Sequence, residues 1–159
     1  MKKKFLWLFA VCLASWASIG LSQTVPAEPK VHMIYMGGND CPPCVVWRGL
    51  ELPKLQQTES FKTIKFSYVT KLIRSTVPAS FFLPSEVKPF KDKLDIASGG
   101  RAGSPQFAIL VDGVVYDYYF GTRSAQDVDR MLIAIRDQTE YPFKRCTKRG
   151  AGNSCVSTD

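Results

Sequence analysis

Runs of hydrophobic and polar residues along the chain predict four β-strands. Residues 31–36 (VHMIYM) form a β-type run, and residues 64–69 alternate apolar with polar positions, as a half-buried strand does. Residues 106–111 are almost continuously apolar. The dipeptide Asp112-Gly113 follows directly and is a strong hairpin signal. Residues 114–120 should therefore return as the antiparallel partner of that strand.

Two helical segments are predicted between these strands. Residues 41–57 have helical spacing, but Pro53 stands four residues after Gly49. Because a proline ring clashes with the carbonyl four residues earlier, we expect a kink or break there. Residues 85–97 could hold a second helix, interrupted early by Pro89. The segment between the second strand and this helix has no readable period.

A third helix closes the fold. Ser124 and Asp127 resemble a capping box. Apolar residues follow at the spacing of an amphipathic helix: Val128, Met131, Leu132 and Ile135. The first two strands flank a helix of crossover length, so they should be parallel with a right-handed connection. The order of elements predicts an α/β fold with a mixed four-stranded sheet covered by helices.

The N-terminus has the pattern of an export signal. Lys2, Lys3 and Lys4 precede an apolar run over residues 5–21, which is typical of a secretory signal peptide. We predict residues 1–22 as the signal peptide and 23–30 as a linker, which places the protein in the periplasm or outside the cell. An uncleaved membrane anchor and a buried N-terminal helix are the alternatives, and contact with a membrane is expected only if the signal stays uncleaved.

Composition narrows the possible functions. The 159 residues are 45% hydrophobic and 22% charged, which indicates one globular domain and excludes a disordered or collagen-like chain. A single histidine excludes a histidine-rich metal site. Removing the leader takes away three lysines and no acidic residue, which lowers the formal charge from +7 to +4. No basic stripe with interleaved aromatic residues remains, so we expect no nucleic-acid partner.

The cysteine count suggests disulfides. Five cysteines minus Cys12, which lies in the leader, leave an even number in an exported chain. Spacing suggests two pairs: Cys41 with Cys44, and Cys146 with Cys155. The second pair lies in the basic tail, residues 139–159, which we expect to be solvated. We interpret it as a structural disulfide; a second redox pair relaying electrons to Cys41 is the alternative.

The motif Cys41-Pro42-Pro43-Cys44 directly follows a predicted strand and opens a helix. The positive potential of a helix N-terminus stabilises a thiolate, which is the attacking form in disulfide exchange. Cys41, at the exposed end, should attack, and Cys44, one turn further, should resolve the mixed disulfide.

The neighbours of Cys41 argue for a weakly stabilised thiolate. Neither Pro42 nor Pro43 has an N–H to donate, and the negative charge of Asp40 disfavours a second one. A less stabilised Cys41 thiolate makes the Cys41–Cys44 disulfide a weaker oxidant. These residues favour, weakly, a reductase or isomerase-like role over a strong oxidase.

Other uses of the same cysteines remain open. The pair could be a static disulfide, or half of a zinc site completed by Cys146 and Cys155, whose spacing does not suit zinc ribbons. Copper could bind through Cys41, Cys44 and His32, although a structural role for His32 is the preferred interpretation. The sequence thus leaves a metallochaperone and an inert, disulfide-stapled interaction domain as alternatives to an enzyme.

Over residues 31–138 the chain resembles the thioredoxin superfamily. The resemblance is carried by the strand–CPPC–helix start, by Ser104-Pro105 before a strand, by the Asp112-Gly113 hairpin and by the closing helix. It implies a thioredoxin-like fold in which Pro105 is cis and faces the cysteines, and Ser104 offers backbone hydrogen bonds to an extended substrate. It further implies exchange with protein thiol or disulfide substrates and an unidentified redox partner, without a cofactor or metal.

Three features depart from thioredoxins proper. Asp40 stands where they have a tryptophan, and Tyr35 stands where they have a buried acid, which leaves Cys44 without an assigned proton-transfer partner. The stretch from Cys44 to Pro105 is also longer than in the minimal fold. We therefore expect an insertion within residues 71–103, before the cis-proline loop.

Overall fold

The computed structural model describes residues 27–150 and 154–156. The predicted signal peptide, residues 1–22 with Cys12, and the first residues of the linker lie outside the described residues. Among the described residues, no helix combines the length and apolarity needed to cross a membrane.

The predicted mixed sheet is present. Its strands are β1 (Val31–Gly37), β2 (Lys65–Thr70), β3 (Gln106–Val111) and β4 (Val114–Phe120), in the order β2-β1-β3-β4. Strand β1 pairs in parallel with β2 and antiparallel with β3, and β3 and β4 form the antiparallel hairpin. The four predicted strands are confirmed to within a residue at each end.

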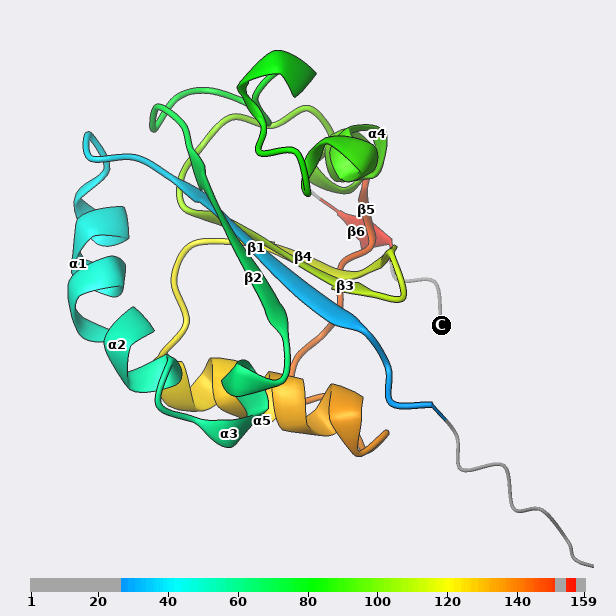
Figure 1. The fold of residues 1–159 in the computed structure, drawn as a ribbon. Helices are drawn as coiled ribbons and strands as arrows, with labels where there is room; N and C mark the ends of the chain where they lie inside the picture. Colours follow the sequence, from blue (N-terminus) through cyan, green and yellow to red (C-terminus); the bar gives the residue numbers. More distant parts are fainter. Residues whose placement is uncertain (1–26, 151–153, 157–159) are drawn as a thin grey trace, which may run out of the picture.

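Helices cover both faces of this sheet (Figure 1). One face carries α1 (Pro42–Leu50), α2 (Leu52–Leu55), α3 (Glu59–Lys62) and α5 (Ala125–Arg136). The other carries the 3-10 turns η1 (Ser80–Phe82) and η2 (Lys88–Phe90) and helix α4 (Lys91–Ser98). The predicted break before Pro53 is confirmed, since α1 ends at Leu50 and Pro53 lies in the first turn of α2.

Two apolar cores explain the largely apolar run in β1. Met33 and Tyr35 pack into the core beneath α1 and α5, whereas Ile34 and Met36 pack into the core beneath α4. Every residue of β1 is buried, because the strand is central and both of its faces are covered.

The segment that could not be read from its pattern, residues 71–84, crosses the second face with little regular structure (Figure 1). Two of its apolar side chains, Val77 and Leu83, lie in the core beneath α4, together with Val87, which follows the segment. Anchors at such irregular intervals give neither a helical nor a strand period, which is why the sequence pattern was uninformative there.

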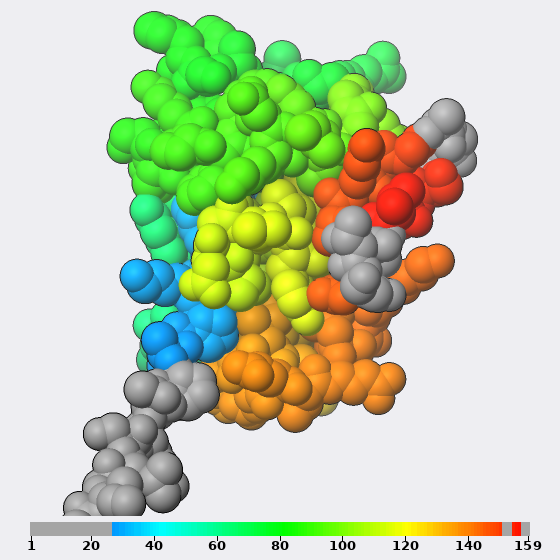
Figure 2. Space-filling view, turned by 90° about the vertical axis from the view of Figure 1, so that its right-hand side faces the viewer, coloured from blue at the N-terminus to red at the C-terminus, as the bar shows by residue number. Residues whose placement is uncertain are grey.

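The tail is docked, so the prediction of a solvated tail is wrong. The backbone N–H of Tyr118 donates to the carbonyl of Cys146 (2.8 Å), and the buried carboxylate of Asp117 accepts from Cys146 N (2.9 Å) and Tyr141 Oη (3.0 Å). Figure 2 shows the tail, in orange and red, lying against the domain beside β4. An edge strand and a buried carboxylate both need hydrogen-bond partners, and the tail supplies them.

The predicted disulfide Cys146–Cys155 is present and closes a small hairpin. Its strands are β5 (Lys148–Arg149) and β6 (Cys155–Val156). The guanidinium groups of Arg145 and Arg149 lie over the rings of Tyr116 and Phe120, 4.5 and 4.8 Å from the ring centroids. The two arginines of the tail therefore face aromatic rings of β4, whereas Lys144 and Lys148 are exposed.

Candidate functional site

The predicted pair Cys41–Cys44 forms a disulfide at the start of α1, with the two Cα atoms 5.2 Å apart. Cys41 is the N-cap residue, and Pro42 and Pro43 form the first turn of the helix. Proline fits there because its fixed φ suits the helix and its missing N–H has no partner to lose. The motif thus begins a helix directly after the short loop that follows β1.

Both cysteines are fully buried, with exposed fractions of 0%. The expectation that Cys41 is exposed is therefore wrong for the disulfide state. Cys41 and Cys44 belong to the core beneath α1, and Ile73, from the segment after β2, packs against that core. The carboxylate of Asp40 accepts a hydrogen bond from Ile73 N (2.9 Å), which ties this segment to the loop before Cys41.

The helix start has no free backbone donor near Cys41. Pro42 and Pro43 carry no N–H, and the amides of Cys44 and Val45 both donate to the carbonyl oxygen of Cys41, at 2.9 and 3.1 Å. The N-terminal donors that often stabilise an anion at a helix start are thus absent or already paired. That the Cys41 thiolate is weakly stabilised stays a prediction, because both cysteines are disulfide-bonded in this structure.

The Ser104–Pro105 peptide bond is cis, as the resemblance implied. Gln106, the next residue, pairs with Met36 across β1 and β3, so the sheet register carries Pro105 to the end of β1 from which the CPPC loop departs. Pro105 is buried, and its carbonyl accepts a hydrogen bond from Gly121 N (3.0 Å). The cysteines and the cis-proline loop therefore lie at the same edge of the sheet.

Lys71 was missed by the sequence reasoning. Its side chain is buried and its ammonium group donates to the carbonyl of Gly103 (2.5 Å) and to Ser104 Oγ (3.2 Å). Burial lowers the pKa of Lys71 to about 8, against the opposing effect of Asp40. Its position directly after a half-buried strand was the signal that could have marked Lys71 as a candidate site residue. Only the fold, however, brings its side chain to the cis-proline loop.

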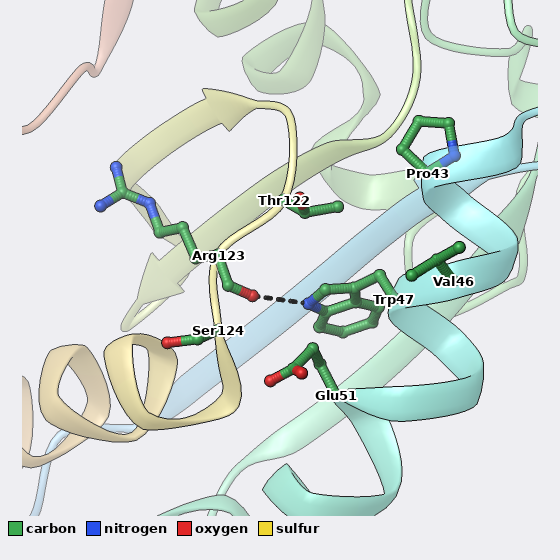
Figure 3. Close-up of a pocket in the computed structure, with 7 residues that line it drawn as sticks. All are labelled: Pro43, Val46, Trp47, Glu51, Thr122, Arg123 and Ser124. Carbon is green, nitrogen blue, oxygen red and sulfur yellow. Dashed lines mark hydrogen bonds between the residues drawn. The ribbon is translucent and has the colours of Figure 1, made fainter.

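An open pocket of about 380 Å³ lies beside the CPPC loop (Figure 3). Its lining residues come from α1 and from the connection between β4 and α5: Pro43, Val46, Trp47, Glu51, Thr122, Arg123 and Ser124. The indole N–H of Trp47 donates to the carbonyl of Arg123 (2.8 Å), while the guanidinium of Arg123 turns away from the pocket. Trp47 is 1% exposed, in agreement with its interpretation as a core residue.

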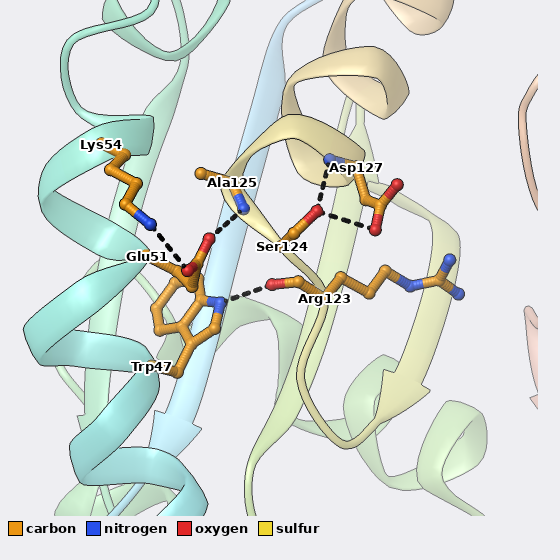
Figure 4. Close-up of polar contacts among 7 residues, drawn as sticks. All are labelled: Trp47, Glu51, Lys54, Arg123, Ser124, Ala125 and Asp127. Carbon is orange, nitrogen blue, oxygen red and sulfur yellow. Dashed lines mark hydrogen bonds and ion pairs between the residues drawn. The ribbon is translucent and has the colours of Figure 1, made fainter.

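Glu51 fixes the end of α1 against the start of α5 (Figure 4). Its carboxylate accepts from Ala125 N (2.7 Å) and from Lys54 Nζ (3.1 Å). The hydrogen bond from Ala125 lowers the pKa of Glu51, with a smaller effect of Lys54. Ser124 caps α5 by accepting from Asp127 N (3.1 Å), so the predicted helix start is confirmed.

His32 is not near the cysteines, so the copper set of Cys41, Cys44 and His32 is wrong. His32 lies near the first residue of β1, whereas the cysteines follow the last. Its Nε2 forms a hydrogen bond with Ser67 Oγ (2.9 Å), and burial lowers its pKa. It is the structural histidine that we preferred. Within the described residues, no three histidine, cysteine or acidic side chains cluster as metal ligands do.

No protein-family model matches the chain, and no curated protein matches it. Solved structures with similar architecture include thioredoxin-2, described as a component of malaria parasite protein secretion machinery. It is 17% identical over 64% of this chain and 79% of its own, with a TM-score of 0.42. Thioredoxin f2 of Chlamydomonas reinhardtii is 15% identical over 71% of this chain and 82% of its own (TM-score 0.39). DsbH oxidoreductase is 17% identical over 67% of this chain and 73% of its own (TM-score 0.42).

These similarities are too distant to carry a function. The sheet order, the parallel and antiparallel pairings and the helices on both faces are properties of this chain itself. With a disulfide at the first helix and a cis-proline before β3, they define a thioredoxin-like fold.

Proposed function

We propose that this protein is an exported thiol:disulfide oxidoreductase that exchanges disulfides with protein substrates through Cys41 and Cys44. The observation that carries the proposal is the Cys41–Cys44 disulfide at the N-terminus of α1, at the same sheet edge as the cis-proline loop. In this proposal Cys41 is the attacking thiolate and Cys44 resolves the mixed disulfide.

The surroundings of the disulfide suit a polypeptide substrate. Ser104 and Pro105 precede β3 and would offer backbone hydrogen bonds to an extended segment. Val46, 57% exposed, and Pro43 provide apolar walls for the pocket beside the motif. We infer that a substrate segment lies along the cis-proline loop with a neighbouring side chain near this pocket.

The direction of electron flow is proposed to be reductive or isomerising. No free backbone N–H in the first turn of α1 faces the sulfur of Cys41, and Asp40 is adjacent to it. Both features raise the free energy of the thiolate and hence of the reduced state. An external dithiol must then regenerate the reduced protein, and this redox partner is not identified.

Export is part of the proposal and rests on residues 1–22. An oxidising compartment, the periplasm or the cell exterior, would maintain the second disulfide, Cys146–Cys155. Expression of the full chain with immunodetection of a shortened product in the periplasm or medium tests this. An uncleaved product retained in the cell would contradict it.

Insulin reduction tests the activity. The mature protein should accelerate precipitation of insulin by dithiothreitol, and Cys41→Ser should abolish the acceleration. Cys44→Ala should instead accumulate substrate proteins as mixed disulfides at Cys41, released by excess dithiothreitol. An inactive wild type with a Cys41–Cys44 bond that resists dithiothreitol would support an inert staple instead.

A metallochaperone predicts a different result. The purified protein would retain copper or zinc in stoichiometric amount, measured by elemental analysis, and Cys41→Ser would lose it. Metal retention without insulin reduction would replace the proposed activity by metal binding.

A further inference from the structure

The hydroxyl of Tyr35 is buried without a hydrogen-bond partner. The side chain is 0% exposed, and its oxygen is among the few buried polar atoms of the described residues that are unsatisfied. Buried polar groups are nearly always paired, so an unpaired hydroxyl in the first core needs an explanation.

Gly37 shows where this hydroxyl points. A Cβ atom built on Gly37 would clash with Tyr35 Oη and would lie only 2.9 Å from Cys44 Sγ. The phenol oxygen and the sulfur therefore share the small space on one side of Gly37. The ring of Tyr35 is held there by stacking on Trp47 (centroids 5.1 Å apart) and by Phe107 (5.2 Å).

The groups that face Tyr35 leave the phenol neutral and able to donate. Arg48, from α1, directs its guanidinium to Tyr68 Oη and Asn39 Oδ1; Tyr68 comes from β2, and β3 contributes the apolar Phe107. Burial raises the pKa of Tyr35 to about 12; Arg48 opposes the shift through its charge and its closeness to the phenol oxygen, and Tyr68 adds to it. A guanidinium can only donate, so Arg48 leaves the hydroxyl proton of Tyr35 without an acceptor. No carboxylate is among these neighbours, so the donor beside Cys44 is the Tyr35 hydroxyl.

We propose that Tyr35 is a positioning residue that donates a hydrogen bond to the sulfur of Cys44 when the disulfide is reduced. A disulfide sulfur is a poor acceptor, which explains the unpaired hydroxyl of the oxidised state. A thiolate is a strong acceptor, so reduction supplies the missing partner. The proposal rests on the proposed function, and it assigns the partner of Cys44 at a position where thioredoxins have an acid.

The hydrogen bond from Tyr35 to Cys44 acts in the second step of disulfide exchange. In the first step the Cys41 thiolate attacks a substrate disulfide, a Cys41–substrate bond forms, and one substrate sulfur leaves as a thiolate. Cys44, whose proton passes to solvent, then attacks Cys41 Sγ; the Cys41–Cys44 bond forms and the second substrate sulfur leaves. Two electrons pass from the cysteines to the substrate. Tyr35 keeps its proton and stabilises the Cys44 thiolate before it attacks.

Stopped-flow reaction of the reduced protein with a chromogenic aryl disulfide separates the steps, because each step releases one coloured thiolate. In Tyr35→Phe the first phase should match the wild type. The second phase should slow about threefold or more at neutral pH, and its pH midpoint should rise by about one unit. The rate of the second phase should fall less than the fraction of Cys44 present as thiolate, because a more basic thiolate is a better nucleophile.

Tyr119→Phe is the matched control. Tyr119 Oη is also buried and unpaired, but its ring stacks on Phe107 and faces Arg123 and Asp117 rather than the sulfurs. This variant should match the wild type in both phases. An unchanged second phase and pH midpoint in Tyr35→Phe, or an equal change in Tyr119→Phe, overturns the proposal. Absence of a first phase in the wild type would overturn the proposed function instead.

Equilibration with glutathione gives an independent measurement. The wild type gains the Tyr35–Cys44 hydrogen bond only on reduction, so Tyr35→Phe should shift the equilibrium toward the disulfide by about tenfold. Tyr119→Phe should not shift it. An equilibrium constant that is the same in Tyr35→Phe and the wild type would contradict the role assigned to Tyr35.

Discussion

At the scale of single residues, Gly37 sets the spacing around the Cys41–Cys44 disulfide. It ends β1, and a Cβ atom there would clash with Tyr35 Oη and lie only 2.9 Å from Cys44 Sγ. The position is a case of close approach, in which the absence of a side chain leaves room for the phenol oxygen and the sulfur beside the backbone.

Gly37→Ala should therefore destabilise the protein by about 1–3 kcal/mol through overpacking, measured by urea unfolding of the oxidised form. Gly49→Ala is the control, because a Cβ there meets no atom within 4 Å and the residue is in α1. That change should be neutral or stabilising by up to about 1 kcal/mol. Equal stabilities of the two variants would contradict the crowding at Gly37.

Lys71 is the residue whose charge should appear in the pH dependence of stability. Its pKa is about 8 in the folded protein, below the ordinary value of 10.5. Below about pH 8 Lys71 is charged in both the folded and the unfolded protein, and burying that charge lowers the free energy of unfolding. As the pH rises from about 8 to about 10.5, the folded protein loses this proton before the unfolded chain does, so the stability rises until Lys71 is neutral in both states.

The wild type should accordingly gain about 1–3 kcal/mol relative to Lys71→Met between about pH 7 and about pH 10, measured by urea unfolding at each pH. The comparison cancels titrations that both proteins share. Parallel stability curves would show that Lys71 is not desolvated at the cis-proline loop.

At the scale of elements, the loop before α1 and the segment after β2 act together. Asp40 binds Ile73 N, and Ile73 packs against the core that contains Cys41. Because the disulfide is fully buried, an attacking thiol reaches it only when covering residues move aside. The hydrogen bond of Asp40 should therefore control access to the disulfide.

Two substitutions at Asp40 separate its hydrogen bond from its charge. Asp40→Ala removes both and should accelerate reduction of the oxidised protein by dithiothreitol several-fold. Asp40→Asn keeps an acceptor for Ile73 N, and its rate should stay within about twofold of the wild type. Equal acceleration in both variants would assign the effect to the charge, and no acceleration in either would show that this contact does not limit access.

At the scale of the whole molecule, the domain and the tail are one packed unit. The tail covers the β4 edge, supplies the donors for Asp117 and is closed by Cys146–Cys155. The backbone of Cys146 forms hydrogen bonds with Tyr118 and Asp117 of β4, and β5, in the hairpin that the second disulfide closes, packs beside α4. None of these contacts involves the CPPC loop. This arrangement favours a structural role over electron relay.

The double variant Cys146→Ala/Cys155→Ala should be less stable by about 2–3 kcal/mol, the chain-entropy contribution of so short a loop. Urea unfolding measures this loss. Insulin reduction below the unfolding transition should stay at the wild-type rate. Loss of activity in the folded variant would favour the relay of electrons to Cys41.

Local patterns were sufficient for much of the fold. Apolar runs, the alternation over residues 64–69, the Asp112-Gly113 turn, the break before Pro53 and the Ser124 cap predicted the strands and two of the helices, because each depends on residues close together in the sequence. The pairing of Cys41 with Cys44 was accessible for the same reason, since they stand three positions apart in the sequence, within one helical turn.

The burial of Cys41, the contacts of Lys71 and Asp117, and the approach of Tyr35 to Cys44 were decided by tertiary structure. Each joins groups that the sheet register, the 71–84 segment, the tail or the turn after β1 brings together. A local pattern records whether a position is apolar, but not which distant group will cover it. The sequence alone determined the four strands of the sheet, the break before Pro53, the start of the last helix and the cysteine pair. Packing decided what surrounds the sulfurs, because burial and hydrogen bonding depend on neighbours that only the folded chain supplies.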